Sequence, residues 1–177
     1  SDLMELSLNY TNNDSEVVAT NDTGGNISLQ EPRSRNLRVT HIVGERYGAL
    51  FGTSFVRDGN GAIVHELVNG YPRPKIDNSR KILGFGVAPQ QIGIGASFRY
   101  KSWDASVLVE GKSGGQIYSG TNATMMGTGA HKMTIPTGGR EAGFVPSGVM
   151  EDGSPVTISI PHGQQSAYWG RYNDAAE

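Results

Sequence analysis

The segment Gln91–Gly111 reads QIGIGASFRYKSWDASVLVEG and contains two runs in which apolar and polar residues alternate. Residues 91–100 place Ile92, Ile94, Ala96, Phe98 and Tyr100 on one side, and residues 103–111 do the same with Trp103, Ala105, Val107 and Val109. Because successive side chains of a strand point to opposite faces, each run predicts a strand with one apolar face. Lys101-Ser102 is short enough for a tight turn, which predicts an antiparallel hairpin whose apolar residues share one face.

The same alternation occurs near the start of the chain, in Leu3–Thr11, which places Met4, Leu6, Leu8 and Tyr10 on one side. We expect this segment to be an antiparallel neighbour of the hairpin strands. Residues 12–90 and 112–177 are then long connections or loops. Within the first we expect further strands at Val17–Thr20, Asn26–Gln30, Leu37–Val43 and Ala49–Val56, and a hairpin turn at Asp58–Gly61.

The composition favours an all-β chain with many turns. Hydrophobic residues make up 36% and charged residues 18% of the chain, whereas 25 of its 177 residues are Gly. Gly, Ser, Thr and Asn tolerate turn conformations and compete against helix hydrogen bonding. The net charge of -2 argues against nucleic-acid binding, which needs clustered Lys and Arg. The chain contains no Cys, and no stretch approaches the ~18 apolar residues of a transmembrane helix.

The short motifs of the sequence do not support an enzyme or a cofactor site. Gly111–Gly115 matches the G-x-S-x-G pattern of a hydrolase, with Ser113 as nucleophile, but residues 116–121 are poor in helix formers and the pattern requires a helix there. The turn at Asp58–Gly61 lacks the Gly and Glu positions of a calcium loop. His41, His65, His131 and His162 are too dispersed for a metal-ligand spacing. We therefore expect no catalytic residue, no metal and no cofactor.

The alternating strands fit two environments. A half-buried sheet of a soluble β-sandwich alternates in this way, and so do the ~10-residue strands of an outer-membrane barrel. Tyr100 and Trp103 flank the short turn at the ends of two apolar faces, where a barrel places its interfacial aromatic residues. A tight turn on one side and long loops on the other also suit a barrel. We therefore predict Tyr100 and Trp103 as membrane-interface aromatics.

Several segments, in order along the chain, resemble the SusC/RagA family of TonB-linked outer-membrane transporters. The resemblance is carried by Leu6–Tyr10 with Asn12, Asn13, Glu16 and Val17, and by Val43–Gly52 (VGERYGALFG) running on to Phe55–Val64. It continues in Phe98–Trp103, in Glu110–Asn122 and in Gly139-Arg140, Gly148-Val149 and Asp152-Gly153. It spans nearly the whole chain. It also accounts for Gly111–Gly115 as loop sequence of the family.

The resemblance implies a barrel of about 22 strands around a plug. Residues 1–177 would be a fragment of it, with spanning strands near 3–11, 91–100 and 103–111 and extracellular loops at 12–90 and 112–177. The function implied is import of a glycan or peptide across the outer membrane of a Gram-negative, Bacteroidetes-like cell. The partners implied are a SusD-like lipoprotein and the TonB complex, acting through a longer parent protein.

Exposed aromatic residues are the candidates for contact with substrate or partner, because their rings can stack on sugars or fill a partner's pockets. They are Tyr47, Phe51, Tyr71, Tyr118, Tyr168 and Trp169. Packing within the loops is the alternative role for each of them. The alternative function is a secreted or surface β-sandwich module that binds carbohydrate or protein.

Overall fold

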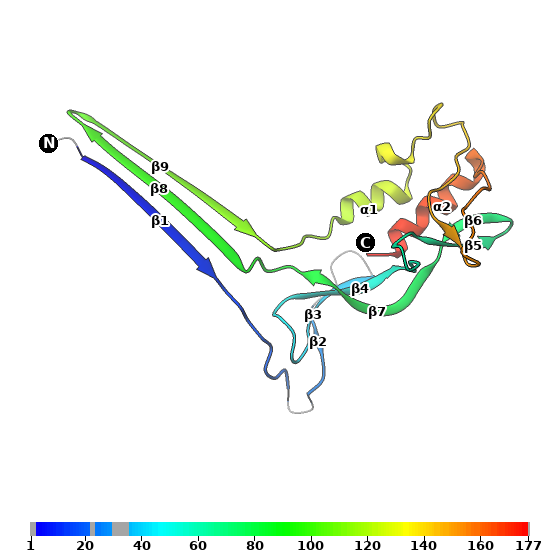
Figure 1. Cartoon of the computed structure of the whole chain (residues 1–177), viewed down its shortest axis with the longest axis horizontal. Helices are drawn as coiled ribbons and strands as arrows, with labels where there is room; N and C mark the ends of the chain where they lie inside the picture. Colours follow the sequence, from blue (N-terminus) through cyan, green and yellow to red (C-terminus); the bar gives the residue numbers. More distant parts are fainter. Residues whose placement is uncertain (1–2, 22–23, 30–35, 177) are drawn as a thin grey trace. The chain divides into compact units, whose positions relative to one another are not determined.

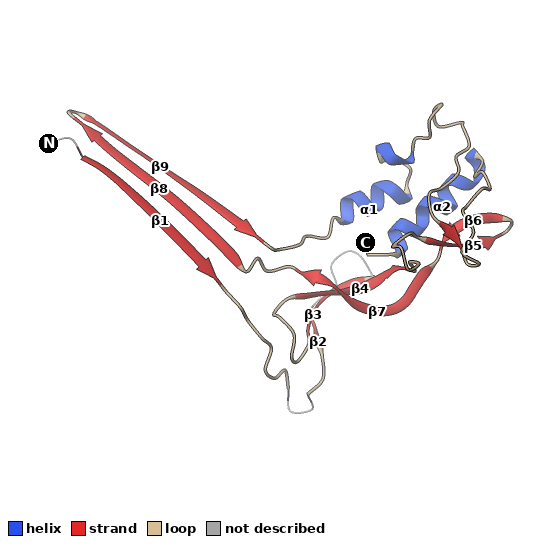
Figure 2. Cartoon of the chain, viewed as in Figure 1, coloured by secondary structure: helices blue, strands red, loops and turns tan. Residues whose placement is uncertain are grey.

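The structure is a computed structural model that describes residues 3–21, 24–29 and 36–176. The chain divides into two compact units, each built from separate stretches of sequence. Unit 1 comprises Ser1–Ile27, His41–Ala49 and Gly84–Ile117, and unit 2 comprises Ser28–Thr40, Leu50–Leu83 and Tyr118–Glu177. Antiparallel β-sheet dominates, as the composition indicates (Figure 2).

Unit 1 is built on an antiparallel sheet of three long strands in the order β1-β8-β9 (Figure 1). They are β1 (Leu3–Asn12), β8 (Gln90–Tyr100) and β9 (Trp103–Ser113). The predicted strands, their antiparallel pairing and the hairpin are thus confirmed, and each strand extends one or two residues beyond its predicted bounds.

The pairing register of this sheet sets which side chains share a face. Ile94 lies opposite Leu8 on one side and opposite Val109 on the other. Ala96 likewise lies opposite Leu6 and Val107. Residues directly opposite one another in a sheet point to the same face. The prediction of one shared apolar face is therefore confirmed.

Unit 2 contains most of a four-stranded sheet and a small three-stranded sheet. The first has the order β2-β3-β4-β7, with β2 (Ile27–Ser28), β3 (Leu37–His41), β4 (Ala49–Phe55) and β7 (Ile76–Phe85). The second has the order β10-β5-β6, with β5 (Val64–Val68), β6 (Tyr71–Pro74) and β10 (Val149–Met150). In this second sheet β10 runs parallel to β5.

The shorter predicted strands have mixed outcomes. Three of them overlap β2, β3 and β4, and the last residue of the predicted Asn26–Gln30 strand lies outside the described residues. Val17–Thr20 is not a strand. The turn at Asp58–Gly61 is confirmed, because the Asp58 carboxylate accepts hydrogen bonds from the backbone N–H groups of Asn60 and Ala62.

Helices occur where the sequence analysis expected loop. They are α1 (Gly120–Gly127), the short 3-10 helix η1 (Lys132–Thr134) and α2 (His162–Asp174). The Ser119 hydroxyl caps α1 by accepting a hydrogen bond from Asn122 N–H at 3.3 Å. The expectation of no helix in residues 116–121 is therefore wrong for Gly120 and Thr121. No helix of the described residues is long and apolar enough to cross a membrane.

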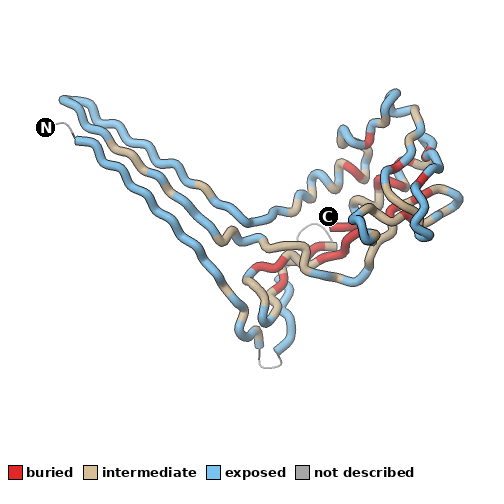
Figure 3. The backbone as a smooth tube through the Cα atoms, viewed as in Figure 1, coloured by how far each residue is buried: buried red, intermediate tan, exposed pale blue. Residues whose placement is uncertain are grey.

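The core of unit 2 holds these helices in place, since short helices are stabilised mainly by tertiary packing. Met126 of α1 packs with Tyr168 and Trp169 of α2 and with Ile160, and all four are buried. Phe144 and Tyr172 pack against this cluster. Figure 3 shows buried segments in unit 2, whereas β1, β8 and β9 are exposed along most of their length.

The β5–β6 hairpin provides a test of the backbone conformation. Asn69 and Gly70 join Val68 to its partner Tyr71, with φ values of 53° and 81°. A Cβ on Gly70 would meet no atom within 4 Å, so Gly70→Ala adds backbone strain and no clash. We expect it to lower the free energy of unfolding by about 1 kcal/mol.

The measurement is urea unfolding followed by the fluorescence of buried Trp169, in a Trp103→Phe background that removes the chain's other Trp. Gly59→Ala is the matched control, because Gly59 also has open space at its Cβ but lacks a positive φ. An equal decrease in the free energy of unfolding in the two variants would contradict the strain argument.

Candidate functional site

The most unusual surface of the chain is one face of the β1-β8-β9 sheet. Leu6 and Leu8 are 68% and 69% exposed, and Val107 and Val109 are 58% and 61% exposed. This apolar face is formed by Met4, Leu6, Leu8, Tyr10, Ile92, Ile94, Ala96, Phe98, Tyr100, Trp103, Ala105, Val107 and Val109. Soluble monomers rarely expose so continuous an apolar surface, which marks a contact with lipid or protein.

The opposite face of the same sheet is polar. It carries Glu5, Ser7, Asn9 and Thr11 from β1, Gln91, Gly93, Gly95, Ser97 and Arg99 from β8, and Asp104, Ser106, Glu110 and Lys112 from β9. Arg99 and Asp104 form an ion pair with an N···O distance of 2.6 Å across the hairpin. Leu3 and Leu108 are the apolar residues on this face. The sheet therefore has one apolar face and one polar face.

The two predicted interface aromatics lie together at the hairpin end. Tyr100 pairs directly with Trp103, and the two side chains are 41% and 78% exposed. The Lys101 ammonium lies 5.0 Å from the centre of the Tyr100 ring. A polar tip on an apolar body suits both aromatics to a boundary between water and an apolar phase.

Of the six predicted contact residues, one lies in unit 1 and five lie in unit 2. Tyr47, in unit 1, is exposed and stacks on His41 with ring centres 4.3 Å apart. Phe51 on β4, Tyr71 on β6 and Tyr118 before α1 are half-buried in unit 2. Among the ring contacts between described residues, the contact of Tyr168 with Trp169 is the only one that joins two of these six, with ring centres 4.9 Å apart.

Tyr168 and Trp169 are not exposed, contrary to the premise on which they were chosen. Only 3% of Tyr168 and 8% of Trp169 is accessible. Phe144 packs on both, with ring centres 5.2 Å from each. The reason is that residues 162–174 form a helix whose aromatic side packs into the core. The sequence analysis expected loop in this segment, and a loop would not have given these residues a common buried side. Packing is thus the observed role of these two residues.

A buried histidine joins this aromatic cluster. His65 on β5 is fully buried, with Nδ1 3.1 Å from Ile63 O and Nε2 3.3 Å from the Tyr168 hydroxyl. Burial lowers the pKa of His65, because desolvation disfavours the charged imidazolium, and hydrogen bonds with backbone at Val149 and Ile63 oppose this in part. Spacing along the sequence gave no sign of this contact, which joins residues 103 positions apart.

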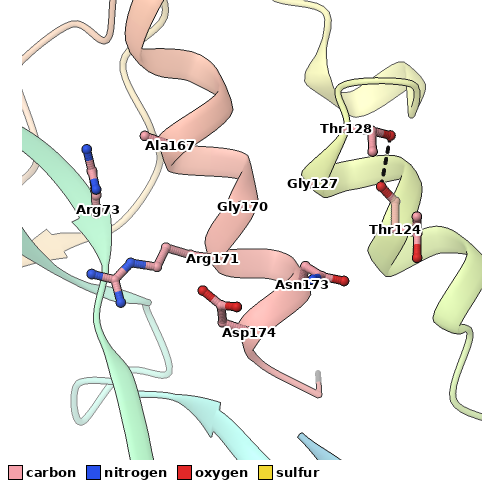
Figure 4. Close-up of a pocket in the computed structure, with 9 residues that line it drawn as sticks. All are labelled: Arg73, Thr124, Gly127, Thr128, Ala167, Gly170, Arg171, Asn173 and Asp174. Atoms are coloured by element: carbon pink, nitrogen blue, oxygen red, sulfur yellow. Dashed lines mark hydrogen bonds between the residues drawn. The ribbon is translucent and has the colours of Figure 1, made fainter. Parts of the chain in front are cut away.

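A polar groove lies between α1, α2 and β6 of unit 2 (Figure 4). Its volume is about 560 Å³, and its lining residues are Arg73, Thr124, Gly127, Thr128, Ala167, Gly170, Arg171, Asn173 and Asp174. Ala167, Gly170, Arg171 and Asp174 are spaced i, i+3, i+4 and i+7, so one side of α2 faces the groove. The residues of the groove are not among the sequence-predicted contacts, because residues 162–174 were expected to be loop and their shared side exists only once they form a helix.

The motif and metal hypotheses gain no geometric support. Ser113 is the last residue of β9 and is exposed, and the next helix begins only at Gly120. This is not the strand-turn-helix arrangement of a nucleophile elbow. Within residues 3–21, 24–29 and 36–176 no group of three or more His, Asp or Glu side chains is placed to hold a metal ion.

The burial of His65 predicts how stability depends on pH. Because its pKa in the folded chain lies below the unfolded value of about 6.5, the unfolded state takes up the proton first as pH falls. The free energy of unfolding should be highest above that value and decrease as the pH is lowered from about 6.5 toward the folded pKa. The measurement is the urea midpoint at pH 7.5, 6.5 and 5.5, again followed by Trp169 fluorescence.

His65→Gln removes the titrating group, so its midpoint should change less over this pH range than that of the unmodified chain. The comparison uses the slope of the urea midpoint against pH. It remains valid even if the variant is less stable than the unmodified chain at every pH. An unchanged slope in His65→Gln would assign the pH dependence to other groups.

Comparison with known proteins adds no family to this description. No family model matches the chain, and no curated protein matches it. Any proposal of function therefore rests on the sequence resemblance and on the geometry of these surfaces.

Proposed function

We propose that this chain forms part of the barrel wall of a SusC/RagA-like, TonB-dependent outer-membrane importer. The observation that supports this most strongly is the exposed apolar face of β1, β8 and β9 set against a polar opposite face. In a barrel of this kind the apolar face meets lipid and the polar face meets the interior.

The lengths of the strands agree with this role. The three strands contain 10, 11 and 11 residues. At about 3.4 Å per residue and a tilt of about 45°, such strands span roughly 25 Å along the membrane normal. That is the height of the apolar band on an outer-membrane barrel. Tyr100 and Trp103 would then lie at one edge of the band.

The open edges of the sheet fit a wall segment. β1 and β9 are the end strands of the described sheet, so each has one edge without a neighbour in that sheet. Unpaired backbone groups cost several kcal/mol each in hydrocarbon. Neighbouring strands of a larger barrel would satisfy them. This supports a role within a longer parent protein.

The rest of the proposal follows from the resemblance. The parent would import a glycan or peptide together with a SusD-like lipoprotein and the TonB complex, and residues 12–90 and 112–177 would form loops at its outer mouth.

The chain would act in transport and not in catalysis. Ser113→Ala should therefore leave uptake by the parent unchanged, and loss of a turnover activity on that substitution would overturn this part.

A β-sandwich binding module is the second candidate. Its apolar strand faces would be covered by a second sheet about 10 Å away. The exposure of Leu6, Leu8 and Val107 argues against this arrangement. The two candidates therefore differ in what contacts the apolar face.

A site-directed spin-label scan tests this difference, and the absence of Cys from the 177 residues leaves a clean background. Ala96→Cys and Val107→Cys place labels on the apolar face, and the adjacent Ser97→Cys and Ser106→Cys place matched labels on the polar face. In isolated outer membranes we expect the first pair to be accessible to oxygen, which partitions into lipid. The second pair should be accessible to a water-soluble nickel chelate.

Two outcomes would contradict the proposal. Equal access of the nickel chelate to both pairs would show that the apolar face is in water. Exclusion of both reagents from the Ala96 and Val107 positions would show that protein covers the face, as in a sandwich.

A further inference from the structure

We propose that the polar groove of unit 2 binds a zwitterionic ligand, a free amino acid or short peptide that carries both a carboxylate and an ammonium group. The groove is the cavity lined by Arg73, α1 and α2 in Figure 4. This inference concerns a binding site in unit 2 and does not depend on whether β1, β8 and β9 lie in a membrane.

The groove holds the guanidinium group of Arg73, for which no described residue provides an acceptor. Arg73 lies directly across the hairpin from Glu66, which would be its natural partner. The Glu66 carboxylate instead accepts a hydrogen bond from Arg171 at 2.9 Å. Within residues 3–21, 24–29 and 36–176, the Arg73 side chain forms neither a hydrogen bond nor an ion pair. A carboxylate in the groove would supply the missing partner, in the charge-assisted geometry that arginine favours.

The groove also holds the exposed carboxylate of Asp174, to which no described residue donates a hydrogen bond. Asp174 is the last residue of α2, and within the described part of the chain its side chain has no ion-pair partner. The C-terminal end of a helix carries partial negative charge, which adds to that of the carboxylate and favours a cation nearby. The amide of Asn173 lines the groove beside it. In the view of Figure 4 the two guanidinium groups lie toward β6, and Asp174 and Asn173 follow toward α1.

The walls between these charges suit a ligand that is polar and thin. Ala167, Gly170 and Gly127 leave the helices without bulky side chains here, and a Cβ on Gly170 would meet no atom within 4 Å. The lining contains Thr124, Thr128 and no aromatic ring. Sugar rings commonly stack on aromatic faces, which this groove does not offer. Opposite charges at separated positions therefore favour a zwitterion over a neutral sugar.

The binding test uses the whole chain in detergent micelles and the dipeptide Ala-Ala as probe, with affinity measured by titration in NMR spectra. Two altered probes each lack one charge: Ala-Ala carboxamide has no carboxylate, and N-acetyl-Ala-Ala has no ammonium. We expect each altered probe to bind about tenfold or more weakly than Ala-Ala, since each loses a charge-assisted hydrogen bond.

Arg73→Gln should weaken binding of Ala-Ala and remove the preference for Ala-Ala over the carboxamide. Asp174→Asn should likewise weaken binding of Ala-Ala, and it should remove the preference for Ala-Ala over N-acetyl-Ala-Ala.

The chain offers a matched pair of variants that test the location. Gly170→Leu places a side chain in the groove, at a position where a Cβ meets no atom within 4 Å, and Gly163→Leu makes the same change on α2 at a residue that also has open space at its Cβ but does not line the groove. Both substitutions favour the helix, and urea unfolding followed by Trp169 fluorescence checks that both variants fold. We expect Gly170→Leu to abolish binding and Gly163→Leu to retain it.

Three results would overturn the inference. They are absence of Ala-Ala binding at millimolar concentration, equal affinity for Ala-Ala and both altered probes, and equal loss of binding in the two leucine variants. Failure here would leave the barrel proposal intact, because that proposal is tested by labels on the β1-β8-β9 sheet.

Discussion

The pairing of β8 with both β1 and β9 is the constraint on which the surface of unit 1 depends. Side chains alternate between faces with a period of two residues, so a slip of one residue in either pairing would move an apolar set to the polar side. The register aligns Leu8, Ile94 and Val109 in one row across the sheet. This alignment places most of the apolar side chains of all three strands on one face and most of the polar side chains on the other.

Gly95 on the polar face lies against a side chain of the neighbouring strand β1. A Cβ on Gly95 would lie only 2.5 Å from the Ser7 hydroxyl oxygen. Gly95 therefore leaves room for the side chain across from it on β1. Gly95 has a packing reason here, although glycine inside a strand lowers its intrinsic stability.

Helix α2 connects the core of unit 2 with its groove. One side of α2 packs into or against the core and carries Tyr168, Trp169 and Tyr172. Another side faces the groove and carries Ala167, Gly170, Arg171 and Asp174. A helix turns by about 100° per residue, so adjacent residues can serve these two purposes. The core that holds α2 in place thereby also positions the charged side chains of the groove. The Arg171–Glu66 ion pair connects the same helix to β5.

The sequence by itself determined the three long strands, their hairpin and the sidedness of their apolar residues, because alternation is a local property with a fixed period of two. It also indicated the turn at Asp58–Gly61, where the side chain of Asp58 bonds to nearby backbone. Only the tertiary structure decided that residues 120–127 and 162–174 are helices, because their stability comes from packing against each other and not from strong helix formers. For the same reason only the tertiary structure decided that Tyr168 and Trp169 are buried, and that Arg73 and Asp174, 101 positions apart in the chain (174 − 73), line one groove.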